Sequence, residues 1–181
     1  EVHNGIMRIG ACVTHHELET DPVIAEHASS LAGVWSEIGN VRVRIAGTLG
    51  GNILSGNPGY DGLPALIALN AVGVIQGTGG PQRVPAVNLN ENKDLGLLTA
   101  IEIQILPSQK FWMHRSLKPA VSVALSVELA SDGVAKARVG IGCAFPFPKG
   151  GPLASAEGLV PGEVARRSDE LAEEFASSLP E

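Results

Sequence analysis

The chain has 181 residues, 44% of them hydrophobic and 18% charged, a composition typical of a globular protein and too apolar for a disordered one. Its net charge of −6 and its lack of a Lys/Arg cluster argue against nucleic acid and anionic membranes as partners. No apolar run approaches the roughly 18 residues that a membrane span needs. The two cysteines, Cys12 and Cys143, are too few for an iron–sulfur cluster, so we expect two small buried side chains in a reducing cytoplasm.

The N-terminal region predicts a strand, a loop and a helix in that order. Residues 7–13 have the pattern of a short strand, and the following loop contains His15 and His16, which we expect to be solvated. A metal site is the less favoured alternative, because no third ligand stands at metal spacing from these histidines. Asp21 suits the N-cap of a helix and Pro22 its first position. The predicted apolar face of this helix comprises Ile24, Ala28, Leu31, Trp35 and Ile38.

The middle of the chain predicts further short elements separated by glycine-rich turns. Residues 41–45 alternate valine or isoleucine with arginine, which indicates a brief strand. An apolar helix is expected over residues 61–71. Strands are expected over 72–76 and near 99–106, where isoleucines alternate with polar residues.

The clearest pattern lies in the C-terminal part. Apolar side chains alternate with small or polar ones over residues 121–129, and again over 139–143. Between these segments Asp132-Gly133 is a strong turn signal, so we expect an antiparallel hairpin whose apolar side chains form its buried face. An amphipathic helix follows. We therefore predict an α+β protein with one lobe over residues 1–107 and a second over 108–181.

Residues 47–52, with the sequence Gly-Thr-Leu-Gly-Gly-Asn, are the segment most suggestive of ligand binding. Paired glycines allow backbone N–H groups to approach an anion or a cofactor closely, so the amides of Gly50 and Gly51 are expected to face a groove. Thr48 adds a hydroxyl and Asn52 an amide. The segment matches neither the dinucleotide fingerprint nor the P-loop, and an ordinary glycine turn is the alternative.

The surroundings of this segment form a recognisable succession. Its parts are Ile9 to Glu19, Arg44 before the Gly-rich segment, Pro58 and Asp61 after it, Arg83 to Pro85, and Arg115 to Ala124 before the Asp-Gly hairpin. In this order they resemble the flavin-binding medium subunit of the molybdenum hydroxylases, the family of xanthine dehydrogenase and carbon monoxide dehydrogenase. The resemblance covers residues 6–175. It implies the second lobe of a two-lobed FAD-binding domain, followed by a small antiparallel sheet with helices.

The resemblance also suggests residues for the cofactor site. In the family a Thr-x-Gly-Gly-Asn loop lies against FAD, an Asp follows it, and a leucine packs on the flavin ring. The candidate FAD-binding residues carried over in this way are Thr48, Leu49, Gly50, Gly51, Asn52, Asp61 and Leu98, with Leu97 as the alternative leucine. From the residues alone, Asp61 is equally compatible with the N-cap of a helix, and the leucine with ordinary core.

The chain departs from the family pattern in two places. Many relatives have a lysine where Phe111 to His114 stand here, and Lys110 is only a loose match. The family also has an earlier lobe with its own Gly-rich loop for the FAD pyrophosphate, and no residue before Ile6 supplies it. We therefore expect the chain to be a fragment, a truncated product or one half of a split subunit.

The function implied by the resemblance is that of a flavoprotein subunit in an oxidoreductase complex. Electrons would pass from a molybdenum centre through iron–sulfur clusters to FAD and then to an acceptor. The implied partners are a molybdenum-cofactor subunit and an iron–sulfur subunit, or a chain that supplies the first FAD lobe. One alternative is a degenerate scaffold or interaction module that no longer holds flavin. Another is a different flavoenzyme of the superfamily, such as an enolpyruvyl reductase or an aryl-alcohol oxidase, against which residues 115–124 argue.

Overall fold

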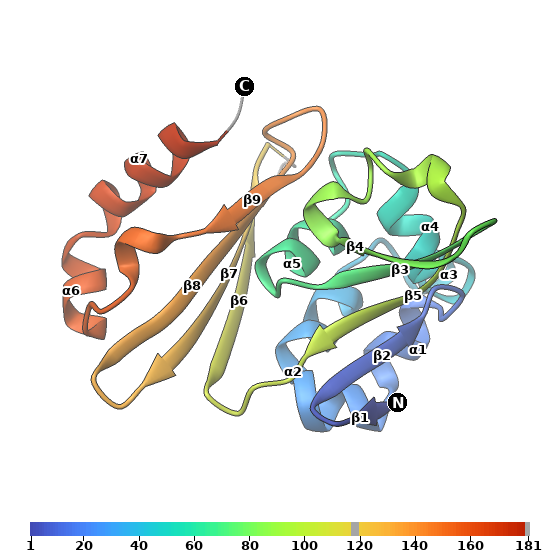
Figure 1. Cartoon of the computed structure of the whole chain (residues 1–181), viewed down its shortest axis with the longest axis horizontal. Coiled ribbons are helices and arrows are strands. Elements are labelled where there is room, and N and C mark those ends of the chain that lie inside the picture. Colours follow the sequence, from blue (N-terminus) through green and yellow to red (C-terminus); the bar gives the residue numbers. More distant parts are fainter. Residues whose placement is uncertain (117–119, 180–181) are drawn as a thin grey trace.

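The computed structural model describes residues 1–116 and 120–179 and confirms the α+β class. Two antiparallel sheets stand at an angle to each other, with helices packed on one face of the first sheet and the last two helices on the outer side of the second (Figure 1). Within the described residues, no helix combines the length and the apolar character needed to cross a bilayer.

The first sheet has five strands in the order β1-β2-β5-β3-β4. Their bounds are β1 Val2–His3, β2 Ile6–Gly10, β3 Val72–Gly77, β4 Gly80–Pro85 and β5 Leu97–Gln104. Strand β5 lies in the centre and pairs with both β2 and β3, which brings the N-terminal segment beside residues about 90 positions away. The predicted strands over 72–76 and 99–106 are thus confirmed, although β5 begins and ends earlier than expected.

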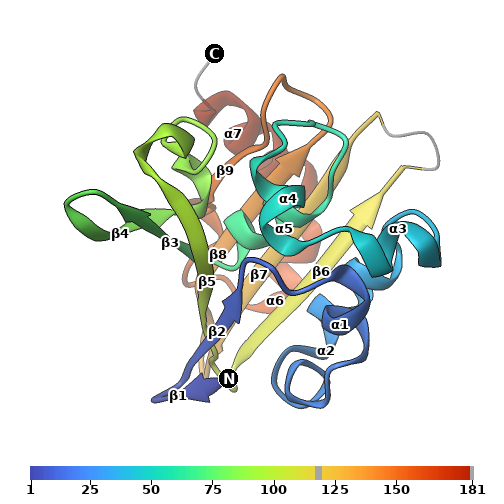
Figure 2. The ribbon, with the colours of Figure 1, turned by 90° about the vertical axis from the view of Figure 1, so that its right-hand side faces the viewer.

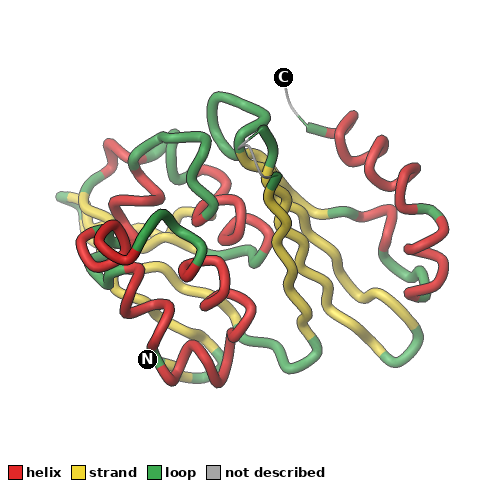
Figure 3. Tube along the Cα trace, turned by 180° about the vertical axis from the view of Figure 1, so that it is seen from behind, coloured by secondary structure: helices red, strands yellow, loops and turns green. Residues whose placement is uncertain are grey.

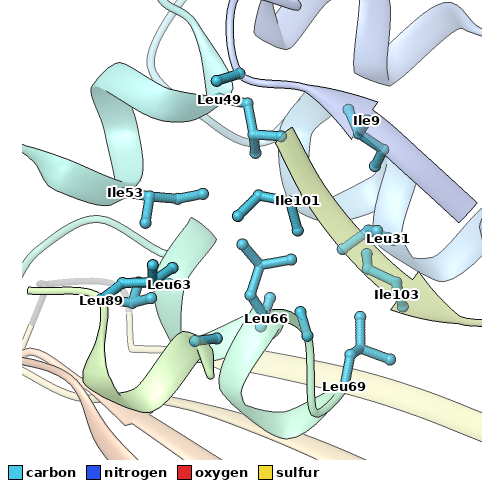
Figure 4. Packing of buried hydrophobic residues seen from close by; sticks show 14 of the residues in the cluster. Ile9, Leu31, Leu49, Ile53, Leu63, Leu66, Leu69, Leu89, Ile101 and Ile103 are labelled. Atoms are coloured by element: carbon cyan, nitrogen blue, oxygen red, sulfur yellow. The ribbon is translucent and has the colours of Figure 1, made fainter. Parts of the chain in front are cut away.

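Five helices lie on one side of this sheet (Figure 2). They are α1 His15–Thr20, α2 Pro22–Ser36, α3 Val41–Ala46, α4 Leu49–Leu54 and α5 Gly62–Ala68. Asp21 caps α2 as predicted, with its Oδ1 accepting from the amides of Val23 and Ile24. The core lies between helices and sheet, where side chains such as Leu66 of α5 meet Ile101 and Ile103 of β5 (Figure 4).

Two local predictions in this region are wrong. The expected loop at Thr14 to His16 is instead the start of α1, because Thr14 and Glu17 form a reciprocal capping box. The expected strand over 41–45 is helix α3, capped by Asn40. Its Val41, Val43 and Ile45 are all exposed, so their alternation does not reflect a buried sheet face.

The second sheet has four strands in the order β6-β7-β8-β9. Its elements and the helices after it are β6 Gln109–Arg115, β7 Ser122–Ala130, β8 Gly133–Gly142, β9 Lys149–Pro152, α6 Pro161–Arg166 and α7 Ser168–Ser178. Short 3₁₀ turns occupy Ala86–Asn88, Lys93–Leu95 and Ala154–Ala156. The predicted Asp-Gly hairpin is confirmed in β7 and β8, and the change of sheet falls between Gln104 and Gln109. Figure 3 shows this sheet between the helices of the first lobe and the two final helices.

In β7 the more deeply buried face is the opposite of the predicted one, whereas in β8 Val139 of the predicted face is buried. Ser122, Ala124 and Ser126 are fully buried, whereas Val123 and Leu129 keep more than a third of their surface exposed. The small face packs on α5, and a Cβ added at Gly140 of β8 would lie 2.0 Å from the carbonyl oxygen of Pro64. Small residues are needed there because α5 and the sheet approach too closely for larger side chains.

The outer face of the hairpin carries a second, smaller core. A satellite core of Val134, Ala137, Ala156 and Leu171 joins the outer face to α6 and α7.

Cys12 is exposed and Cys143 is half-buried, so neither is the fully buried side chain that was predicted.

Candidate functional site

A cavity of 520 Å³ lies where α1, α3 and α4 meet the start of α5 and the end of β6. Its walls combine polar side chains with the glycine backbone of the segment singled out in the sequence. The lining residues are His15, Ile38, Gly39, Val43, Ala46, Gly47, Thr48, Gly51, Asn52, Ser55, Gly59, Tyr60, Asp61 and Arg115. Four of the seven candidate residues, Thr48, Gly51, Asn52 and Asp61, therefore line one cavity.

The Gly-rich segment forms the first turn of α4 rather than an open loop. Thr48 is its N-cap, and the Thr48 Oγ1 accepts from the Gly51 amide at 3.2 Å. The Gly50 amide donates to the carbonyl oxygen of Ala11 at 2.8 Å. The prediction that both glycine amides face a groove is therefore wrong, because both are occupied by the protein itself.

The two glycines have different structural roles. Gly51 lines the cavity, where the absence of a side chain keeps the wall open. Gly50 faces β2 instead, and a Cβ added to it would lie 3.1 Å from both the Cβ and the carbonyl oxygen of Ala11. Gly50 thus allows α4 to pack closely against the end of the strand, which is a structural need rather than a ligand contact.

Asp61 and Arg115 join the two lobes across the cavity wall. The Arg115 Nη1 donates to the Asp61 Oδ2 at 2.9 Å, and the Asp61 Oδ1 is a buried atom without a hydrogen-bond partner among the described residues. Burial raises the pKa of Asp61 above its ordinary value, although the neighbouring Arg115 charge opposes this shift. Asp61 occupies the N-cap position of α5 but makes no capping hydrogen bond, so the pairing with Arg115 replaces the capping role considered above.

Asn52 and His15 complete the polar wall. The side chain of Asn52 is buried and its Oδ1 has no partner within the described residues. His15 is 3% exposed and stacks on Trp35 with ring centroids 5.5 Å apart. The expectation that His15 is solvated is therefore wrong. Among the described residues, no group of three or more His, Cys, Asp or Glu could hold a metal ion.

The remaining candidates lie away from the cavity. Leu49 is fully buried in the core of the first lobe. Leu98 is also a core residue and faces the Gly73 backbone, whereas Leu97 is 72% exposed. None of the three lines the cavity described above.

Among the polar side chains of the cavity wall, sequence reasoning did not assign His15, Ser55, Tyr60 and Arg115 to the site. Arg115 was noted only as part of a domain start. A cation was nevertheless to be expected near Asp61, because a buried carboxylate in an apolar helix turn needs a partner. No local signal in the sequence distinguishes His15 from its exposed neighbours.

The cavity wall fits a polar, hydroxyl-rich ligand. The side chains of Thr48, Asn52 and Asp61 offer a hydroxyl, an amide and a carboxylate group for hydrogen bonds to such a ligand. A carboxylate repels phosphate, so Asp61 suits the ribityl or ribose hydroxyls of a dinucleotide, while Arg115 carries a charge that suits phosphate. The fold is thus an α+β fold with a polar cavity beside the glycine-rich start of α4.

The comparisons with known proteins identify the family. A sequence model for "FAD binding domain in molybdopterin dehydrogenase" matches residues 1–103, and the chain belongs to this family. The family's cofactor is FAD, and the chain is thus a flavoprotein of the molybdopterin dehydrogenase class.

Individual relatives agree with this assignment. The chain is 27% identical over 101 residues to the nicotinate dehydrogenase FAD-subunit of Eubacterium barkeri, covering 56% of this chain and 34% of that protein. It is 26% identical over 151 residues to the glyceraldehyde dehydrogenase medium chain of Sulfolobus acidocaldarius, covering 77% of this chain and 53% of that protein. The chain thus spans about a third to a half of these relatives.

The fold has solved counterparts. The structure of quinoline 2-oxidoreductase from Pseudomonas putida 86 superimposes on 99% of this chain and on 66% of the matched chain, with a TM-score of 0.80 and 23% identity. This likeness includes both lobes, so the second sheet and its helices belong to the same architecture.

Proposed function

We propose that this chain forms part of the FAD site in the medium subunit of a molybdenum hydroxylase-type oxidoreductase. The observation that supports the proposal is the cavity in which Thr48, Gly51, Asn52 and Asp61 come together. When bound, FAD accepts electrons from iron–sulfur clusters and passes them to an acceptor, and the protein positions the cofactor.

The residues of the cavity bind and orient the cofactor. Asp61 and Asn52 line the cavity and are the side chains that would hydrogen-bond hydroxyl groups of the cofactor. Arg115 holds the Asp61 carboxylate in place and adds positive charge to the wall. Because Arg115 comes from β6 of the second lobe, both lobes contribute to the site.

The proposed partners are a molybdenum-cofactor subunit and an iron–sulfur subunit. We further propose that the remaining part of the FAD site comes from polypeptide outside these 181 residues, because the relatives are longer than the matched region. Charge-assisted hydrogen bonds contribute about 1.5–3 kcal/mol each. Two or three missing bonds would weaken binding by about two orders of magnitude or more. The chain alone should therefore bind FAD only above the submicromolar range.

The test is a titration of the ¹⁵N-labelled chain with FAD, followed by amide NMR spectra. We expect shifts at the amides of Thr48, Gly51 and Asn52 with weak affinity, and weaker shifts still in Thr48→Ala. Thr20→Ala is the matched control, because the Thr20 hydroxyl donates to the carbonyl of His16 away from the cavity. Absence of any shift at these amides would favour the scaffold alternative. A tight stoichiometric complex would contradict the argument that the site is shared with other polypeptide.

A further inference from the structure

His15 is held rigidly at the back of the cavity. Its backbone amide donates to the carbonyl of Gly47 at 3.0 Å, and its ring lies parallel to Trp35 with an interplanar angle of 2°. A Cβ added at Gly47 would lie 2.9 Å from the ring Cδ2. The imidazole is therefore clamped between Trp35 and the Gly47 backbone, and its orientation is set before any ligand arrives.

The two ring nitrogens of His15 lie in different environments. Nδ1 is fully buried and has no hydrogen-bond partner among the described residues. Nε2 is not one of these fully buried atoms, and it lies 3.0 Å from where a Cβ on the cavity-lining Gly47 would stand, so Nε2 is on the cavity side of the ring. Burial lowers the pKa of His15, which favours the neutral ring near pH 7.

The proton of a neutral imidazole occupies one nitrogen only. On Nδ1 it would be a buried donor with no acceptor, which native structures rarely tolerate. On Nε2 it points towards the cavity, where a ligand can accept it. The burial pattern therefore favours the Nε2–H tautomer of His15.

The site needs such a donor. FAD is rich in acceptor oxygens, but the amides of Gly50 and Gly51 are already bonded within the protein. The backbone of the glycine turn therefore does not supply donors, and side chains must do so. The ring of His15 is one neutral donor of the cavity wall, and its orientation is fixed by the stack on Trp35.

We propose that His15 is a further FAD-binding residue, whose Nε2–H donates a hydrogen bond to an oxygen of the cofactor in this cavity. The inference rests on the proposed function of the chain and adds a specific donor to it. Trp35 keeps the ring in place through the stack, and Gly47 leaves room for it.

The first test reads the tautomer directly. Long-range ¹H–¹⁵N spectra distinguish protonated from unprotonated ring nitrogens, and we expect His15 in the Nε2–H form without ligand. FAD should then shift the Nε2 resonance and leave the Nδ1 resonance nearly unchanged. A His15 ring protonated at Nδ1 would overturn the inference, even if FAD binds at the glycine turn.

The second test compares two variants of α1. His15→Phe keeps a flat ring to stack on Trp35 but removes the donor, and His16→Phe is the neighbouring control. The affinity for FAD should fall about tenfold in the first variant and stay near the wild-type value in the second. Thermal unfolding shows whether His15→Phe is folded, and His15→Gln, which retains a donor, should recover part of the affinity.

The outcomes separate the two proposals. If FAD shifts the amides of Thr48 and Asn52 equally in wild type and His15→Phe, the role of His15 is refuted and the proposed function stands. If FAD leaves those amides unmoved in wild type, the proposed function fails and the inference fails with it. Parallel titrations with riboflavin and with ADP show which half of the cofactor carries the accepting oxygen.

Discussion

Replacing Arg115 with Met should destabilise the protein by leaving the buried Asp61 carboxylate unpaired. Met preserves most of the side-chain volume while removing the charge that lies 2.9 Å from the Asp61 Oδ2. Removing one partner of a fully buried pair costs about 3–5 kcal/mol. Because the Arg115 side chain is 37% exposed, solvent screens the pair, and we expect a loss of about 2 kcal/mol. For a chain of this size that corresponds to a fall in Tm of about 4–8 °C.

The loss of stability caused by Arg115→Met should depend on pH. Burial raises the folded-state pKa of Asp61, so its contribution to stability is present at low pH and is lost as pH rises through that pKa. Arg115 stabilises only the ionised carboxylate, so Arg115→Met should cost most near neutral pH and less in acidic buffer. Asp61→Asn removes the titrating carboxyl group. In that background the loss of stability caused by Arg115→Met should be the same in neutral and in acidic buffer.

The assay is chemical unfolding of both single variants and the double variant at two pH values. The double-mutant cycle should show a coupling between Asp61 and Arg115 near neutral pH. Arg167→Met is the control, because Arg167 forms its ion pair with Glu170 on the exposed surface of α7. Equal destabilisation by Arg115→Met at both pH values, or a loss no larger than in Arg167→Met, would refute the reasoning.

Two further predictions concern packing. Gly140→Ala should destabilise the chain by about 1–3 kcal/mol in chemical unfolding, because the new methyl group collides with the Pro64 carbonyl of α5. Gly151→Ala in the neighbouring strand has open space and should change stability little, so equal losses would contradict the packing of α5 on the sheet. Leu66→Ala should cost about 2–5 kcal/mol by thermal unfolding, since Leu66 is fully buried in the core. The exposed Leu97→Ala is its control, and a comparable cost there would show that the placement of the core is incorrect.

The sequence patterns correctly predicted the elements that depend only on residues close together in the sequence. A capping side chain and a proline at the next position start α2, and Asp132-Gly133 makes the hairpin turn, without help from distant residues. The Gly-rich segment and Asp61 were likewise recognisable as a group, through their residue types and order. They do meet in one cavity, although the roles of the two glycines differ from those expected.

The sequence could not show how the site supplies its hydrogen-bond donors. Whether a glycine amide is free depends on what lies opposite it, and the Gly50 amide meets the carbonyl of Ala11, which follows strand β2 about forty positions earlier. The same holds for His15, whose neighbour His16 has the same side chain. Only the packing of Trp35 and Gly47 around His15 makes it a buried part of the cavity wall.

By itself, the sequence determined the α+β class, the hairpin, the capped helix α2 and the segment that forms the cavity. Only the tertiary structure decided that residues 41–45 form a helix and that the small side chains of β7 are its buried ones. Alternation says that two faces of a segment differ, but burial is set by the element that packs on each face. Here α5 approaches so closely that only Ser, Ala and Gly fit beneath it, and the larger valines are left on the outer side.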